Sequence, residues 1–310
     1  MTSIQSKICP GESATFRFGT TDVETGEAFQ IMECDTSGIF FTHPQPPDLN
    51  RYYPEDYRGF HPLVEKVFRK MYGKYAAAVI RKVGASGRLL EVGCGAGWML
   101  EAFAQRGWEV AGLERTSSIA QEITERTGIK VYTGDLALIQ TEERFDVILL
   151  YNVLEHLPDP GAVIDHCKRL LNPGGRIIIT LPNILSWQAR LTKGSWFHLD
   201  APRHLFHFSE ASMGRFLNSH GLEITSFRNT SLALDIFGWV QSVQNLLLPK
   251  TNQLHVLMSQ NSVLKAIVNV WGIPVGILTA IMLPPAVLAA LASFPFRRSA
   301  IMEVWAGLDA

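Results

Sequence analysis

The sequence predicts an α/β fold in which a parallel sheet is covered by helices on both faces. After residue 87, short apolar runs such as "RLLEVG", "WEVAGLE" and "FDVILLYN" alternate with segments of helical periodicity. This rhythm is typical of strands that are parallel and buried on both faces. A glycine-rich loop at residues 91–97 directly follows the first of these runs, as in sheets that bind a nucleotide. The 310 residues suffice for one large domain with additions, or for two domains.

The N-terminal part predicts two smaller units. Residues 1–50 contain the β-like runs "ATFRF", "AFQIMEC" and "GIFFT", separated by turn residues, and we expect a small separate β-rich unit there. Its core is expected to use the apolar side chains Phe16, Phe18, Phe29, Ile31, Ile39 and Phe40. Residues 51–87 carry apolar side chains at helical spacing and predict a lead-in helix that Gly73 could interrupt.

The remaining chain divides into three parts. Residues 88–232 form the predicted core, whose last helix starts at Ser209 and stops at Gly221 before the strand "LEITSFRN". Residues 233–296 are a hydrophobic helical insertion. Residues 297–310 contain "SAIMEVWAGL", the expected last strand of the core.

Charge and cysteine content exclude several classes of protein. The formal net charge is −1 and no long basic run occurs, so we expect no nucleic-acid groove. Four scattered cysteines are too few for a disulfide framework, and the N-terminus has no apolar signal segment. We therefore expect a cytoplasmic protein.

The glycine loop indicates the class of ligand. Glycine lets the backbone approach a ligand closely, and the following helix offers free N–H groups. A dinucleotide-binding loop that started at Gly93 would need its last glycine at residue 98, where Trp98 stands. The form with Glu91 ahead of three glycines instead suits a ligand that carries an ammonium group and no phosphate. S-adenosylmethionine is such a ligand.

Five segments in order resemble the motifs of class I S-adenosylmethionine-dependent methyltransferases, in the ubiquinone-biosynthesis-like or type-23 group. They are residues 91–97, "VAGLE", "TGDL", "FDVILLYNVLEHLPDP" and "LLNPGGRIIITLPN". The resemblance implies a Rossmann-like fold with a seven-stranded sheet in the order 3-2-1-4-5-7-6. It also implies a set of cofactor-binding residues, namely Glu91, Gly93, Cys94, Gly95, Gly97, Glu114, Arg115, Asp135, Leu136 and Asn152.

Methyl transfer is an in-line displacement, so the protein must align two reactants and, for a hydroxyl acceptor, remove a proton. The candidate catalytic residues are His156 in "LEHLPDP" and His204 and His207 in "LDAPRHLFHFS", a segment that resembles the acceptor-side cap of the type-23 group. Structural roles compete with catalysis for all three. A metal site at His204 and His207 would need a third ligand, and we expect none.

A degenerate zinc knuckle is expected in the N-terminal unit. Many members of the resembled group begin with two C-x-x-C pairs, whereas this chain pairs Cys9 with Glu12 and Cys34 with Ser37. Because half of the thiolates are missing, we expect no bound metal.

The predicted function is methyl transfer from S-adenosylmethionine to a small-molecule or lipid-linked acceptor, most simply at oxygen. Two alternatives stay open at this point. One is a catalytically silent protein that binds the cofactor, and the other is an NAD-dependent oxidoreductase, which Trp98 disfavours.

The hydrophobic insertion needs a separate explanation. Residues 266–296 contain no charged side chain and are flanked by Lys265, Arg297 and Arg298. If the strands on both sides belong to one sheet, membrane crossings must be even in number, and two spans would need about 40 apolar residues. We expect Pro284 and Pro285 to break the run into a hairpin that dips into one leaflet. Burial against the core and a homodimer contact are the alternatives for residues 263–296.

Overall fold

A computed structural model describes residues 13–53, 62–135, 141–229, 231–249, 251–259 and 272–308. Its centre is a seven-stranded sheet in the order β10-β11-β8-β7-β4-β5-β6. The strands are β4 (Arg88–Val92), β5 (Glu109–Glu114), β6 (Lys130–Thr133), β7 (Phe145–Tyr151), β8 (Leu171–Pro182), β10 (Leu222–Asn229) and β11 (Ile301–Leu308). Numbered within the sheet, this is the order 3-2-1-4-5-7-6, so the predicted topology is confirmed.

The sheet is parallel except at β11. The pairs β4–β5, β5–β6, β4–β7 and β7–β8 are parallel, whereas β11 is antiparallel to both β8 and β10. The carboxyl ends of β4, β5, β7 and β8 therefore meet at one edge, where open α/β sheets bind ligands.

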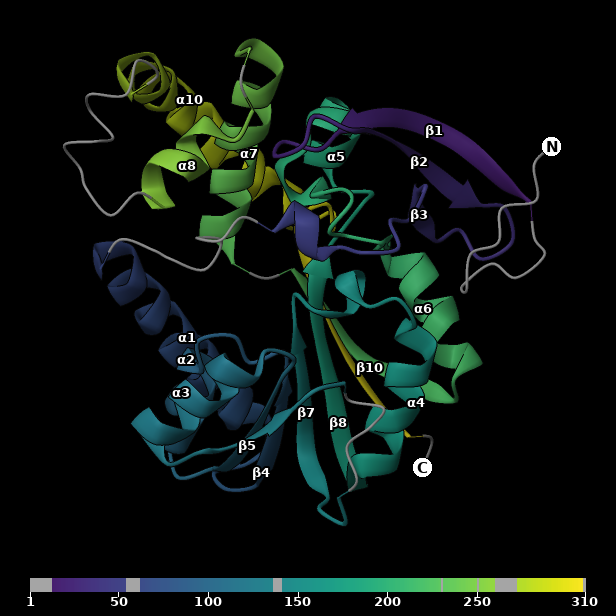
Figure 1. The fold of residues 1–310 in the computed structure, drawn as a ribbon, viewed down its shortest axis with the longest axis vertical. Helices are drawn as coiled ribbons and strands as arrows, with labels where there is room; N and C mark the ends of the chain where they lie inside the picture. Colours follow the sequence, from purple (N-terminus) through teal and green to yellow (C-terminus); the bar gives the residue numbers. More distant parts are fainter. Residues whose placement is uncertain are drawn as a thin grey trace.

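Helices cover both faces of the sheet (Figure 1). One face carries α1 (Pro62–Val83), α2 (Trp98–Ala104) and α3 (Ser117–Thr127), and the other carries α4 (Pro160–Leu170) and α6 (Glu210–Ser219). The helix α1 continues through Gly73, so the interruption considered there does not occur. Ser209 caps α6 in a capping box with Ser212, as its sequence position predicts.

A second sheet lies above the carboxyl edge of the main sheet (Figure 1). Its order is β1-β2-β3-β9, with β1 (Ala14–Thr21), β2 (Ala28–Cys34), β3 (Phe40–His43) and β9 (Phe206–His207). Because β9 comes from the segment after β8, the N-terminal unit is not separate, contrary to expectation. Arg203 strengthens this connection by an ion pair to Asp22.

A further expectation for this unit, that Phe16 lies in its core, is wrong. Phe16 is 55% exposed instead of buried, because the β1–β2 register shifts between Phe16 and Phe18 and the side-chain alternation shifts with it. Cys34 is disulfide-bonded, so it has no thiolate to offer a metal.

The hydrophobic insertion forms a helical layer next to the second sheet (Figure 1). It contains α7 (Leu232–Leu247), α8 (Gln253–Ser259) and α10 (Gly272–Ser293), of which α10 packs along α7. The predicted break at Pro284 and Pro285 is wrong, because α10 is one helix that contains both prolines. Each proline removes a single N–H donor, and the turns on either side keep the helix continuous. Burial against the core does not hold for α10 either, because only 17% of its apolar stretch is buried.

A buried carboxylate attaches this layer to the core. Asp235 of α7 accepts hydrogen bonds from the amide of Gln188 on α5 (Trp187–Thr192), from the hydroxyl of Ser293 on α10 and from the backbone N–H of Ala300. Its side chain is buried, and burial raises the pKa of the Asp235 carboxyl to about 6. One side chain therefore connects four segments that are distant in the sequence.

Candidate active site

The glycine loop connects β4 to α2 at the carboxyl edge of the sheet. Gly93, Gly95 and Gly97 have φ values of +70°, +52° and +76°, which L side chains rarely adopt. A Cβ on Gly93 would lie 2.7 Å from Val153, and one on Gly97 would lie 2.9 Å from Ile123. A Cβ on Gly95 would meet nothing within 4 Å. The loop is therefore packed at both ends and open in the middle.

Two buried acids lie beside this loop. Glu114 ends β5, and its carboxylate accepts hydrogen bonds from the backbone N–H groups of Gly95 (3.2 Å) and Thr116 (3.0 Å). Glu91 lies in β4 with one carboxylate oxygen, Oε2, that has no hydrogen-bond partner among the described residues. Burial raises the pKa of the Glu91 carboxyl well above its usual value. An unpartnered buried oxygen of this kind costs free energy unless a ligand satisfies it.

Asn152 extends the same edge from the end of β7. Its backbone has a φ of +53° and its N–H donates to the carbonyl of Thr180 at 2.8 Å. The side-chain oxygen Oδ1 is buried and has no partner within the described part of the chain. Two unpartnered acceptors thus occur close to one edge of the sheet, that of Glu91 in β4 and that of Asn152 directly after the neighbouring strand β7.

The other predicted cofactor residues are distributed around this edge. Arg115 follows Glu114 and donates to the side-chain oxygen of Asn50 at 3.2 Å. Asp135 follows β6 and is exposed, whereas Leu136 lies outside the described residues. The Cys94 side chain packs toward Gly112, where a Cβ would lie 2.8 Å from its sulfur, so only the Cys94 backbone belongs to the open loop.

The structure brings two of the three candidate histidines together. The ring centroids of His156 and His204 are 4.5 Å apart. His156 Nδ1 lies 3.0 Å from the carbonyl oxygen of Arg203, and His204 Nδ1 lies 3.1 Å from that of His198. A carbonyl only accepts, so both Nδ1 atoms carry the proton and both Nε2 atoms are left with a lone pair.

Burial sets the charge of these two rings. It lowers the pKa of His156 below its usual value and lowers that of His204 further, because His156 is its neighbour. Both imidazoles are therefore neutral at pH 7. His156 is only half-buried, so it is the more accessible of the two.

His207 lies deeper, in the second sheet. It belongs to β9, pairs with Phe40 of β3, and has its Nε2 atom 3.1 Å from the hydroxyl of Thr42. Its ring centroid is 6.3 Å from that of His204, and burial lowers the pKa of His207 to about 3. This arrangement ties His207 to the second sheet.

Glu155 and Asp200 are neighbours that the sequence reasoning did not identify. A carboxylate oxygen of Glu155 lies 4.0 Å from His204 Nε2, and one of Asp200 lies 3.9 Å from the same atom. Burial raises the pKa of the Glu155 carboxyl to about 8, whereas Arg203 holds the pKa of Asp200 below its usual range despite burial. The adjacency of Glu155 to His156 in "LEHLPDP" was the available signal.

One group of these residues has the composition of a metal site. Glu155, His156 and His204 each offer one ligand atom, and these atoms lie within 4.8 Å of one another. The third ligand that His204 lacked in the sequence comes from the segment after β7. Two imidazoles fixed through Nδ1 and one carboxylate are a donor set that suits zinc or iron.

Comparison with known proteins gives sequence relatives of one kind. The chain is 37% identical over 110 residues to the ubiquinone biosynthesis O-methyltransferase of Pseudomonas fluorescens strain Pf-5. The aligned region covers 33% of this chain and 47% of that protein. It is 34% identical over 103 residues to the enzyme of the same name from Alkalilimnicola ehrlichii, over 31% and 42% of the two chains. The chain thus spans about half the length of these curated relatives.

A solved structure shows a more distant likeness. Magnesium protoporphyrin IX methyltransferase from Synechocystis PCC 6803, with bound SAH, is 19% identical, with a TM-score of 0.43, over 53% of this chain and 77% of that one.

The family model described as Methyltransferase domain matches residues 65–226, which contain the whole glycine loop and the histidine cluster. The relatives also confirm the resemblance to the ubiquinone-biosynthesis-like group. Because the family match covers half of the chain, the chain belongs to that methyltransferase family.

Proposed function

We propose that this protein transfers a methyl group from S-adenosylmethionine to an oxygen atom of a small-molecule or lipid-linked acceptor. The observation that carries the proposal is the open glycine loop at the carboxyl edge of the sheet, with unpartnered oxygens of Glu91 and Asn152 next to it. A ligand that offers hydrogen-bond donors at this place would satisfy both oxygens. The ammonium group and the ribose hydroxyls of S-adenosylmethionine are such donors.

Glu114 has the geometry expected of the residue that binds the ribose hydroxyls of S-adenosylmethionine. Its carboxylate is held at the tip of β5 by two backbone N–H groups, so its orientation is fixed before a ligand arrives. The backbone of Gly95, beside which a Cβ would meet nothing within 4 Å, is bonded directly to this acid. We assign the adenine end to Asp135 and Leu136 on the resemblance alone.

His156 is our choice for the proton acceptor. Its Nε2 atom has a lone pair, the ring is neutral at pH 7, and it is more accessible than His204 or His207. A neutral imidazole within reach of an acceptor hydroxyl removes the proton as the oxygen attacks the methyl group. His204 and His207 are then positioning residues, since each is tied to neighbouring polar groups.

The resemblance supports a cytoplasmic enzyme without a nucleic-acid partner, and the exposed apolar insertion supports a peripheral contact with a membrane. The predicted segment for this contact is 263–296, of which residues 263–271 lie outside the described part of the chain. A membrane contact favours an acceptor that resides in the lipid phase. A homodimer through the same surface is the competing arrangement.

A matched pair of glycine variants tests cofactor binding. Gly95 and Gly174 both have positive φ values, and a Cβ on either would meet nothing within 4 Å, but Gly174 lies in a turn at the start of β8. Gly95→Ala and Gly174→Ala therefore impose similar backbone strain, and only the first fills the loop. Calorimetry is expected to show at least tenfold weaker binding of S-adenosylmethionine for Gly95→Ala and unchanged binding for Gly174→Ala.

Turnover separates the proposal from its alternatives. Formation of S-adenosylhomocysteine with a cell extract as the source of acceptor would support methyl transfer. Binding of S-adenosylmethionine without any turnover would leave a silent cofactor-binding protein. Thermal stabilisation by NAD(H) and not by S-adenosylmethionine would refute the proposal in favour of an oxidoreductase.

A further inference from the structure

The exposed face of α10 is apolar along its whole length. The buried side chains of this helix are Val275, Ala286, Ala290 and Ser293, and the large exposed ones include Ile273, Ile277, Ile281, Leu288 and Leu291. At 100° per residue these five exposed residues fall within one narrow stripe, opposite the buried set. We call this stripe the α10 ridge. Ile281 and Leu288 are 65% and 69% exposed.

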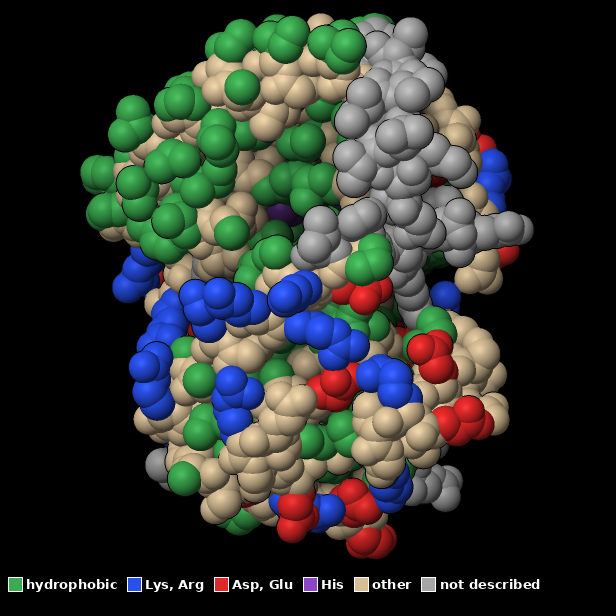
Figure 2. Space-filling model, turned by 90° about the vertical axis from the view of Figure 1, so that its left-hand side faces the viewer, with side chains coloured by type: hydrophobic (Ala, Val, Ile, Leu, Met, Phe, Trp, Pro, Cys, Tyr) green, Lys and Arg blue, Asp and Glu red, His purple; other side chains and the backbone are tan. Residues whose placement is uncertain are grey.

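A water-exposed helix normally presents polar side chains on the face away from its core. The α10 ridge has the reverse composition, and further large apolar side chains are exposed nearby at Leu246, Leu247, Met258 and Phe296. Figure 2 shows these helices as a continuous area of hydrophobic side chains in the upper part of the molecule. Contiguous apolar area of this kind marks a contact with another protein or with lipid.

Packing fixes the orientation of α10 relative to the protein. The hydroxyl of Thr279 and the carbonyl of Val275 both accept hydrogen bonds from Gln244 of α7, and Ser293 is bonded to Asp235 near the other end of α7. The buried face of α10 thus follows α7 from Val275 to Ser293, and α7 itself is bonded to the core. By length and composition α10 could span a bilayer, but its attachment to α7 near both ends favours entry into one leaflet.

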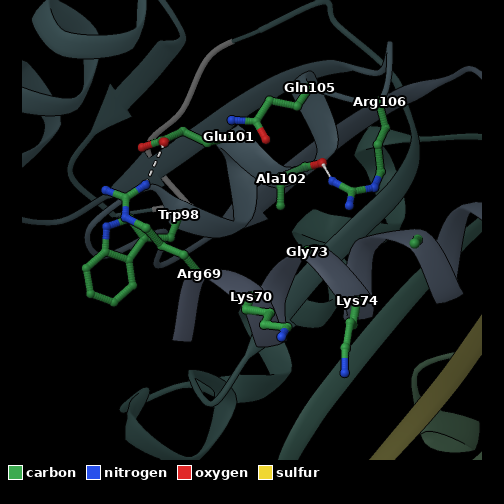
Figure 3. A pocket seen from close by; sticks show the side chains of 10 residues that line it. Arg69, Lys70, Gly73, Lys74, Trp98, Glu101, Ala102, Gln105 and Arg106 are labelled. Carbon is green, nitrogen blue, oxygen red and sulfur yellow. Dashed lines mark hydrogen bonds and ion pairs between the residues drawn. The ribbon is translucent and has the colours of Figure 1, made fainter. Parts of the chain in front are cut away.

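A basic depression occurs on the same face of the molecule. It has a volume of about 570 Å³ and lies between α1 and α2, where Arg69, Lys70, Lys74 and Arg106 surround it with Glu101 as its one acid (Figure 3). Glu101 is bound by Arg69 at 2.8 Å and by Arg126. Among the described residues Lys70 and Lys74 form no ion pair, and at a spacing of four they extend from the same side of α1 (Figure 3).

The apolar and basic surfaces lie next to each other. In Figure 2 a band of Lys and Arg side chains runs below the hydrophobic area, and a hollow with a histidine at its base lies within the hydrophobic area near that band. An apolar ridge at the depth of acyl chains and cations at the depth of headgroups are the two parts of an interfacial membrane site. A second protein would explain the apolar ridge without requiring the cations.

We propose that the α10 ridge and the basic depression together dock the protein on an anionic phospholipid bilayer, with the ridge in one leaflet and Lys70 and Lys74 at the headgroups. This inference rests on the peripheral contact in the proposed function but not on methyl transfer. The hollow then faces the bilayer, so that a lipid-linked acceptor enters it directly from the membrane.

Sedimentation with lipid vesicles tests the docking. Intact protein is expected to sediment with vesicles of equal parts phosphatidylcholine and phosphatidylglycerol, and much less with phosphatidylcholine alone. Ile277→Ser with Ile281→Ser is expected to weaken binding to the mixed vesicles about 100-fold, because two exposed apolar side chains no longer enter the leaflet. Lys70→Gln with Lys74→Gln is expected to weaken the same binding about 30-fold.

Controls separate docking from folding and from catalysis. Phe16→Ser removes an exposed aromatic side chain from β1, away from α10 (Figure 1), and is expected to leave vesicle binding unchanged. Binding of S-adenosylmethionine is measured on every variant and is expected to be equal to that of intact protein. If intact protein binds vesicles but not the cofactor, the proposed function fails while the docking stands.

Three results would overturn the inference. The first is intact protein that stays in the supernatant with both kinds of vesicle. The second is a dimer in detergent-free buffer that the Ile277 and Ile281 changes convert to a monomer, because the ridge would then bind a second copy. The third is equal binding to neutral and anionic vesicles with no effect of the lysine changes.

Discussion

Replacement of Asp235 by alanine tests how the hydrophobic layer is attached to the core. The change removes an acceptor from three donors, which are the Gln188 amide, the Ser293 hydroxyl and the Ala300 backbone N–H. A buried donor left without a partner costs about 1–3 kcal/mol. The Ser293 hydroxyl keeps a second acceptor, the Ala290 carbonyl, so two buried N–H groups lose their partner. We therefore expect Asp235→Ala to lower the free energy of unfolding by about 2–6 kcal/mol when the carboxyl is neutral.

The loss of unfolding free energy in Asp235→Ala is expected to decrease as the pH rises, which is opposite to the behaviour of most bonded aspartates. Burial raises the pKa of Asp235 from its usual value near 3.8 to about 6, so the folded protein binds a proton more tightly than the unfolded chain. The carboxyl therefore stabilises the fold below pH 4, and that stabilisation is lost as the pH rises to 6. One pKa unit corresponds to about 1.4 kcal/mol, so the loss amounts to about 3 kcal/mol at most.

The alanine variant lacks this titration, and its defect is expected to shrink as the pH rises. The free energy of unfolding of both proteins is measured by urea denaturation at pH 4 and pH 7, so that other titrating groups cancel in the difference. The expected loss is about 2–6 kcal/mol at pH 4 and smaller by about 2–3 kcal/mol at pH 7. Ser293→Ala removes one donor and no charge. Because the Ser293 hydroxyl lowers the pKa of Asp235, the small loss in this variant is expected to be larger at pH 7 than at pH 4, opposite to that of Asp235→Ala.

A loss that grows between pH 4 and pH 7 would refute this reasoning. It would mean that the three donors stabilise the carboxylate more than burial destabilises it, as in an ordinary bonded aspartate whose pKa is lowered. Asp235→Asn gives an independent check, because the amide does not ionise and so never places a charge in this buried position. Its stability relative to wild type is expected to improve as the pH rises.

Three further predictions concern the site and the second sheet. Glu114→Ala is expected to weaken S-adenosylmethionine binding in calorimetry by about 2 kcal/mol, since hydrogen bonds to a charged acceptor are lost, and unchanged affinity would remove Glu114 from the ribose. His156→Gln is expected to lower kcat about 10²- to 10⁴-fold with cofactor affinity retained, whereas full activity would exclude His156 as the proton acceptor. Arg203→Met is expected to cost about 3–5 kcal/mol in thermal or urea unfolding, because it leaves the buried Asp22 and the neighbouring Asp200 without their cation, and a loss below 1 kcal/mol would show that this ion pair is dispensable.

The sequence by itself determined the main sheet and the location of the cofactor loop. Strands that are buried on both faces appear as short continuous apolar runs, and βαβ connections are short and right-handed, so the order of the runs leaves few topologies. The glycines at 93, 95 and 97 were informative for a local reason. Their positive φ values are a property of the loop itself, so residue type alone indicates the backbone conformation.

Tertiary structure decided which distant residues meet. The contact between His156 and His204, and the position of Glu155 beside them, depends on how the segment after β8 folds back over the sheet edge, which no local pattern encodes. Likewise, β9 joins the N-terminal sheet because two residues pair with β3, too short a run to show alternation. Phe16 was assigned to a core on alternation alone, and a shift in register exposed it.

The hydrophobic insertion shows most clearly what the sequence alone could not predict. Composition alone established that residues 266–296 carry no charged side chain, and the order of the predicted strands led us to expect that the chain returns to the same sheet. Proline's local preference predicted a break in α10 that is absent, because the helix packs lengthwise on α7 on both sides of the prolines. Only the folded structure shows which face of α10 is exposed, since that depends on where Gln244 and Asp235 anchor the helix.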